Sequence, residues 1–89
     1  MSNVFIAFQD NEDSRPIIDA ILADNDKAEA TYPTGLVKII APDSLVIRRD
    51  SIEELIGRSF NLQQIHVNLV TLSGHIDEDD DQFSLSWTH

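Results

Sequence analysis

The chain has 89 residues, no cysteine and a formal net charge of −10, from 16 acidic and 6 basic side chains. This length supports one domain with a modest core, and the missing cysteines exclude disulfides, thiolate catalysis and cysteine-bound metal. The charge argues against nucleic acid and membrane surfaces as partners, because both are bound mainly through Lys and Arg. We therefore expect a soluble, cytoplasmic protein whose partner is another protein.

The first half of the chain predicts a strand, a helix and a hairpin. The apolar run 4–8 (VFIAF) is typical of a buried strand and is too short for a signal peptide or a membrane span. Capping residues follow, and Pro16 suits a first helical turn, so a helix should begin between Asn11 and Ser14 and end at 24–26. A short strand over 28–32 and a longer one over 36–40 follow.

The middle of the chain predicts a strand over 45–49, with Arg48 and Arg49 on opposite sides of it, and then a second helix. Ser51 and Glu54 match a capping box at its start, and Gly57 can end it. The buried side of this helix should be Ile52, Leu55 and Ile56.

The last third predicts a strand over 65–72, a turn and acidic loop over 73–81, and an alternating strand over 83–87. Phe83, Leu85 and Trp87 lie on one face of that last strand and are expected in the core. The fold class is therefore α+β. We expect a single small domain over residues 1–89, made of two β-α-β-β units (1–43 and 44–89), with two helices packed on a mainly antiparallel sheet.

Signatures of catalysis are missing from the sequence. There is no glycine-rich phosphate loop and no nucleophile elbow, and the three histidines are not spaced as ligands on a helix. Those histidines are His66, His75 and His89. No catalytic, cofactor-binding or metal-binding residue is assigned.

The acidic run 77–81 has three interpretations. Asp77, Asp79 and Asp81 occupy the first, third and fifth positions of a calcium loop, but Gln82 and Thr88 stand where that loop needs glycine and glutamate. A solvated hairpin loop is the first interpretation, and a patch that meets a basic partner surface is the second. Calcium binding is the third.

Three segments resemble one protein family in the same order along the chain. They are VFIAFQDNED (4–13), IRRDSIEELIGRSFNLQQ (47–64) and SGHIDEDDDQFSLSW (73–87). Together they are similar to the regulatory, effector or coupling proteins of bacterial multicomponent di-iron monooxygenases, most closely in the phenol hydroxylase branch and more distantly to regulatory protein B of soluble methane monooxygenase. The resemblance implies two β-α-β-β units, no metal or cofactor, and docking on the di-iron hydroxylase component of an aromatic monooxygenase. It also implies control of active-site access and coupling of NADH consumption to hydroxylation.

The same resemblance indicates where the partner binds. In the methane branch, the strand before the hairpin glycine is implicated in controlling entry to the active site. Anchored on Gly74, the matching positions here are 68–72, of which Asn68 and Thr71 are polar. The candidate partner interface is Asn68, Val70, Thr71, Leu72, Gly74, Asp79 and Asp80. The alternative is a strand covered on both faces, with Val70 and Leu72 in the core.

Two other functions are alternatives to the regulatory role. A small-molecule-sensing regulatory domain would bind an effector between subunits and change on binding it. A small enzyme using carboxylate acid–base chemistry would need two acids paired in one pocket, which the sequence does not identify.

Overall fold

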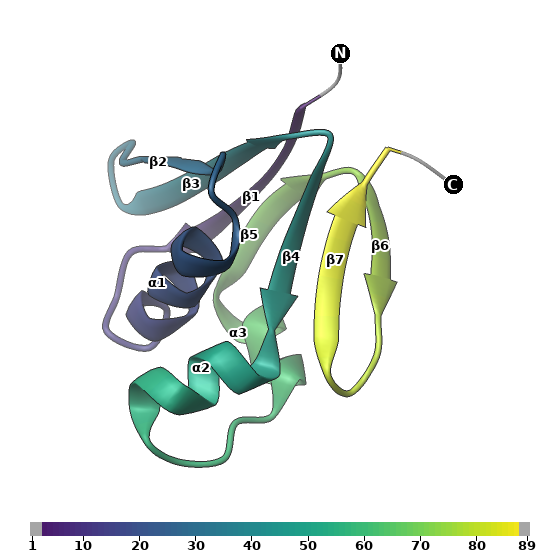
Figure 1. The fold of residues 1–89 in the computed structure, drawn as a ribbon. Helices are drawn as coiled ribbons and strands as arrows, with labels where there is room; N and C mark the ends of the chain where they lie inside the picture. The colour runs from purple at the N-terminus through teal and green to yellow at the C-terminus, as the bar shows by residue number, and fades with distance from the viewer. Residues whose placement is uncertain (1–2, 88–89) are drawn as a thin grey trace.

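Two antiparallel sheets are formed by the seven strands of the computed structural model, which describes residues 3–87 (Figure 1). The strands are β1 (Asn3–Gln9), β2 (Glu29–Thr31), β3 (Leu36–Pro42), β4 (Ser44–Arg48), β5 (Leu69–Ser73), β6 (His75–Glu78) and β7 (Gln82–Ser86). The helices are α1 (Arg15–Asp24), α2 (Arg49–Ile56) and α3 (Ile65–Asn68), with a 3-10 turn, η1 (Leu62–Gln64), before α3. The first sheet has the order β2-β3-β1-β5, and the second has the order β4-β7-β6.

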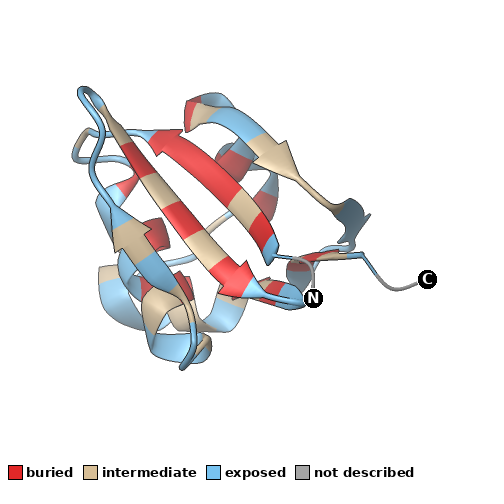
Figure 2. Cartoon of the chain, turned by 90° about the horizontal axis from the view of Figure 1, so that it is seen from above, coloured by how far each residue is buried: buried red, intermediate tan, exposed pale blue. Residues whose placement is uncertain are grey.

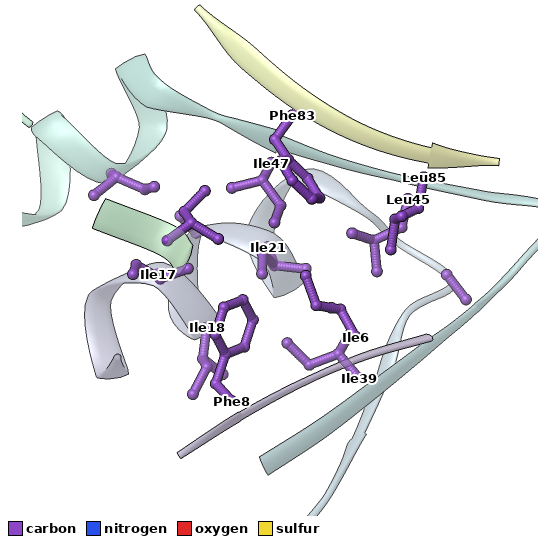
Figure 3. Close-up of a cluster of buried hydrophobic side chains, with 14 of the residues drawn as sticks. Ile6, Phe8, Ile17, Ile18, Ile21, Ile39, Leu45, Ile47, Phe83 and Leu85 are labelled. Carbon is purple, nitrogen blue, oxygen red and sulfur yellow. The ribbon is translucent and has the colours of Figure 1, made fainter. Parts of the chain in front are cut away.

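One hydrophobic core lies between the two sheets and α1 (Figure 3). Alternate residues of β1 and β3 face it, which gives β3 the striped burial pattern visible in Figure 2. From α1 come Ile17, Ile18 and Ile21, at the spacing of one helix face. From the second sheet come Leu45, Ile47, Phe83 and Leu85, all fully buried. Each such side chain contributes about 1.5 to 3 kcal/mol by leaving water.

Several expected elements are confirmed. Helix α1 starts directly after Ser14 and carries Pro16 in its first turn, where a missing N–H costs nothing. Helix α2 ends at Gly57, whose φ of 72° is the left-handed conformation that glycine adopts readily. The α+β class and the antiparallel pairing are confirmed as well.

The predicted capping box at Ser51 and Glu54 is wrong. Helix α2 begins three residues earlier than the box predicts, at Arg49, with Arg48 instead of Ser51 at the cap position and no side-chain cap. Arg49 therefore does not lie on the preceding strand. Its backbone N–H donates to the carbonyl of Asp81 at 2.9 Å, and its guanidinium pairs with the Asp81 carboxylate at 3.0 Å. This shared anchor fixes where the helix starts.

The buried side of α2 is also narrower than expected. Ile52 is fully buried and Ile56 is half-buried, but Leu55 is 55% exposed and so does not belong to the core.

The predicted strand over 65–72 is wrong in its first half, because residues 65–68 form α3. The side chain of Asn61 caps the preceding turn by accepting a hydrogen bond from the Gln63 N–H at 3.0 Å. Leu62 and Ile65 then lie three residues apart and are both buried, as on one helical face. The strand β5 is therefore confined to 69–73.

The region 73–81 contains a strand that the sequence did not predict. β6 pairs with β7, and the acidic loop shrinks to the turn after Glu78. The prediction that Trp87 lies in the core is also wrong, since this residue is 40% exposed. Its Nε1 donates to the carbonyl of Asn3 at 2.8 Å.

Strand β5 joins the two parts of the chain. It lies beside β1 at the edge of the first sheet, with Ser73 opposite Phe5 and Thr71 opposite Ala7. A β-bulge interrupts this pairing between Ala7 and Phe8. The edge strand is thus bent next to the residues that sequence analysis assigned to the partner interface.

Candidate partner interface

Strand β5 presents two of the candidate interface residues to solvent. Leu69 lies opposite Phe8 and Thr71 opposite Ala7, so Val70 is the extra residue of the bulge. Val70 is 47% exposed, and Thr71 is exposed beside it. The next residue, Leu72, lies opposite the fully buried Ile6 and packs against the core. The bulge therefore exposes Val70, whereas Leu72 faces inward.

Asn68 is a buried polar residue with an identified partner. It is 8% exposed, and its Oδ1 accepts a hydrogen bond from Nδ2 of Asn11 at 2.9 Å. Asn11 is itself held, because its Oδ1 accepts from the backbone N–H of Ser14 at 3.0 Å. Ser14 is fully buried, and its hydroxyl donates to the carbonyl of Gln9 at the end of β1. Asn68 thus ties α3 to the loop before α1 and does not lie on the surface.

Gly74 connects the edge strands of the two sheets. Its φ of +138° is a conformation that other residues rarely adopt, and an added Cβ would lie 3.1 Å from Cγ1 of the buried Val4. Glycine is therefore required here by backbone geometry and by space. Gly74 therefore sets the angle between β5 and β6.

The two acidic candidates differ in their roles. The Oδ1 of Asp79 accepts from the N–H groups of Asp81 at 2.8 Å and Gln82 at 2.9 Å, which closes the β6–β7 turn. These hydrogen bonds, that of Gln82 first, hold the pKa of Asp79 below its ordinary value. Asp80 is exposed at the tip of the same turn. Asp79 is therefore a turn-forming residue, whereas Asp80 accepts neither of these hydrogen bonds.

The acidic turn is also tied to α3. Nε2 of His66 lies 3.1 Å from a carboxylate oxygen of Glu78, and the imidazole packs edge-on against the ring of Phe83. Within residues 3–87, no group of three or more His, Asp or Glu side chains is arranged to hold a metal ion. Three carboxylates of this hairpin are engaged otherwise: that of Asp79 in the turn, that of Glu78 with α3 and that of Asp81 with Arg49.

Sequence reasoning missed a surface that includes β5 and extends beyond both of its ends. Residues 59–76, which we call the uncharged segment, contain no Asp, Glu, Lys or Arg, although the chain carries 22 such residues (16 acidic and 6 basic). Val67 is 75% exposed in this segment and Ile76 is 49% exposed. The gap in the charge pattern was visible in the sequence, but residues 65–68 were expected in a strand and not in the helix α3, on which Val67 is exposed. The exposed residues of the uncharged segment, including Val70 and Thr71 of β5, form the candidate interface.

The chain has two sheets around one core, a net charge of −10 and an uncharged, partly apolar surface within residues 59–76. These features are those of a small α+β binding protein. No helix within residues 3–87 is long and apolar enough to cross a membrane. The chain belongs to the MmoB/DmpM family, whose sequence model matches residues 2–86. The resemblance expected from the three sequence segments is thereby confirmed.

Individual relatives agree with this assignment. The stimulatory component DmpM of phenol 2-monooxygenase from Pseudomonas sp. strain CF600 is 42% identical over 86 residues, which are 97% of this chain and 96% of the relative. A chain in a solved structure of the phenol hydroxylase–regulatory protein complex matches with a TM-score of 0.95 at 41% identity, over 98% of this chain and 100% of that one. Soluble methane monooxygenase regulatory protein B shares the fold, with a TM-score of 0.75 at 21% identity over 97% of this chain and 65% of that one.

Proposed function

We propose that this chain is the regulatory component of a phenol-type multicomponent monooxygenase and binds its di-iron hydroxylase component. The observation that carries the proposal is the match over 98% of the chain, with a TM-score of 0.95, to a chain in a phenol hydroxylase–regulatory protein complex. In this role the chain is not an enzyme and has no cofactor. It controls access to the hydroxylase active site and couples NADH consumption to hydroxylation of an aromatic substrate.

We also infer that residues 1–89 act as one regulatory domain in the cytoplasm. Supporting the location is the reaction itself, since the NADH that drives such a hydroxylation is a cytoplasmic reductant.

The proposed docking surface consists of the exposed residues of the uncharged segment, including those of β5. Removing water from a carboxylate is expensive, so an interface centre free of charge is cheaper to form. Interface cores are depleted in charged residues for this reason. Asp80 is exposed in the turn after β6, and the net charge of −10 favours approach to a basic partner. Asn68, Leu72 and Gly74 contribute by holding the exposed residues in place.

A test of the function uses purified hydroxylase and reductase with increasing amounts of this chain. Product formed per NADH consumed should rise and saturate near one regulatory chain per active site. No rise at any ratio would refute the proposed function.

A test of the docking surface compares Val70→Lys with Tyr32→Lys. Tyr32, after β2, is 66% exposed and lies outside the uncharged segment. Both lysines can reach solvent, so both variants should melt close to the parent protein. Val70→Lys should bind the hydroxylase at least about tenfold more weakly, because it places a charge in the desolvated centre of the interface. A folded Val70→Lys variant with unimpaired stimulation would exclude β5 from the docking surface.

A further inference from the structure

A cleft of about 400 Å³ opens beside the uncharged segment, between the start of α1, the loop after α2, and α3. Ile17, Ile56 and Phe60 give it an apolar wall. Val67, 75% exposed, lines it as well, and Val67 also belongs to the uncharged segment. The cleft is therefore continuous with the proposed docking surface.

Acidic side chains determine which group suits this cleft. Glu12 and Asp13 line it and are exposed, and none of the ion pairs within residues 3–87 includes either of them. Arg58 lines the cleft too. The formal charge of the cleft lining is therefore −1, from two acids and one base. An occupant that pairs with Glu12 and Asp13 must be cationic at one end and apolar along its length.

We propose that this cleft receives a basic side chain, by preference an arginine, from the surface of the hydroxylase. This inference rests on the proposed function and adds the chemistry of one contact. The methylene stem would pack on Ile17 and Ile56, and the planar guanidinium would stack on the ring of Phe60. Its N–H groups would donate to the carboxylates of Glu12 and Asp13 in charge-assisted hydrogen bonds. Lysine supplies the same charge without the stacking plane, so arginine fits the aromatic wall better.

The test separates this contact from the general charge of the chain. Glu12→Gln/Asp13→Asn removes two negative charges at the cleft. Asp24→Asn/Asp26→Asn removes the same two charges at the opposite end of α1, where both acids are exposed. The dissociation constant for the hydroxylase is measured for both variants at low salt and at about 0.5 M salt, where long-range attraction is screened.

Both variants should lose the same salt-dependent part of the affinity. The cleft variant should lose about tenfold more, and this difference should persist at high salt because the contact is desolvated. Phe60→Leu, which keeps the apolar volume but removes the ring, should weaken binding severalfold. Circular dichroism melting confirms that each variant is folded.

Three results would overturn the proposal. The first is equal loss in the two charge variants, with the parent protein still binding and stimulating the hydroxylase. The second is saturable NMR shifts of the Phe60 ring on adding phenol alone, with hydroxylase binding unchanged, which would assign the cleft to a small molecule. The third is failure of the parent protein to bind the hydroxylase at all, which would refute the proposed function together with this contact.

Discussion

Replacing both Asn11 and Asn68 with aspartate should destabilise the protein far more than either replacement alone. In the parent protein, Nδ2 of Asn11 donates to Oδ1 of Asn68 at 2.9 Å. In Asn68→Asp, the carboxylate still accepts that hydrogen bond. In Asn11→Asp, the amide of Asn68 can turn and donate to the new carboxylate. Each single variant keeps one hydrogen bond but places a charge at a half-buried or buried position, so each should lose roughly 1 to 3 kcal/mol.

The double variant has two acceptors and no donor at this contact. Two carboxylates about 3 Å apart repel by roughly 5 kcal/mol at an effective dielectric constant of about 20. Small movements and water will reduce this, so we expect about 3 kcal/mol of destabilisation beyond the sum of the single changes. For a chain of this size the total free energy of unfolding is about 4 to 13 kcal/mol, so the double variant should be near its unfolding limit.

Urea unfolding followed by circular dichroism at pH 7 and pH 5 measures this coupling. Repulsion raises the pKa of one of the two introduced carboxyls in the folded state above its unfolded value. The double variant should therefore regain stability as the pH falls through that raised pKa. Additive losses at pH 7, or a double variant with no gain at lower pH, would show that the two side chains do not face each other.

Two further changes test the turns on either side of β6. Gly74→Ala should destabilise by about 2 to 3 kcal/mol and lower the melting temperature by roughly 10 °C, because it combines a φ of +138° with a 3.1 Å approach to Val4. Gly35→Ala is its control, since the φ of +75° is also unfavourable there but no atom lies within 4 Å, and it should lose clearly less; equal losses would contradict the close approach. Asp79→Ala should remove a pH-dependent part of the stability, because the folded-state pKa of Asp79 lies below 3.8. That part is present above about pH 4 and is lost as the pH falls through the lowered pKa, so the urea midpoints of parent and variant should converge in acid, and a constant difference would contradict the hydrogen-bonded turn.

Local patterns in the sequence predicted most elements whose residues decide their own conformation. The apolar run of β1, the proline in the first turn of α1 and the glycine after α2 each act through their own backbone preferences. The prediction of a strand at residues 65–68 was wrong because Ile65 and Val67 favour strands intrinsically. The burial of Leu62 and Ile65 on one side of the chain favours a helical turn instead. The predicted start of α2 was wrong because Arg49 is held by Asp81, which lies far along the chain.

The candidate interface was predictable in part for the same reason. The resemblance pointed to a strand on which Val70 and Thr71 are exposed. The bulge that separates Val70 from Leu72 depends on pairing with β1, which a local pattern does not contain. The hydrogen bond that holds Asn68 comes from Asn11, in a loop 57 residues away in the sequence.

The pairing of β5 with β1 has a consequence for synthesis of the chain. Phe5 lies opposite Ser73, so one edge of β1 stays bare until nearly the whole chain has left the ribosome. At about 5 to 20 residues per second this interval lasts several seconds, far longer than a hairpin needs to form. A bare, apolar β-strand is a template for aggregation during that time. Asp10, Glu12 and Asp13 follow this strand immediately and act as gatekeepers, so their charges protect the nascent chain before they can serve any partner.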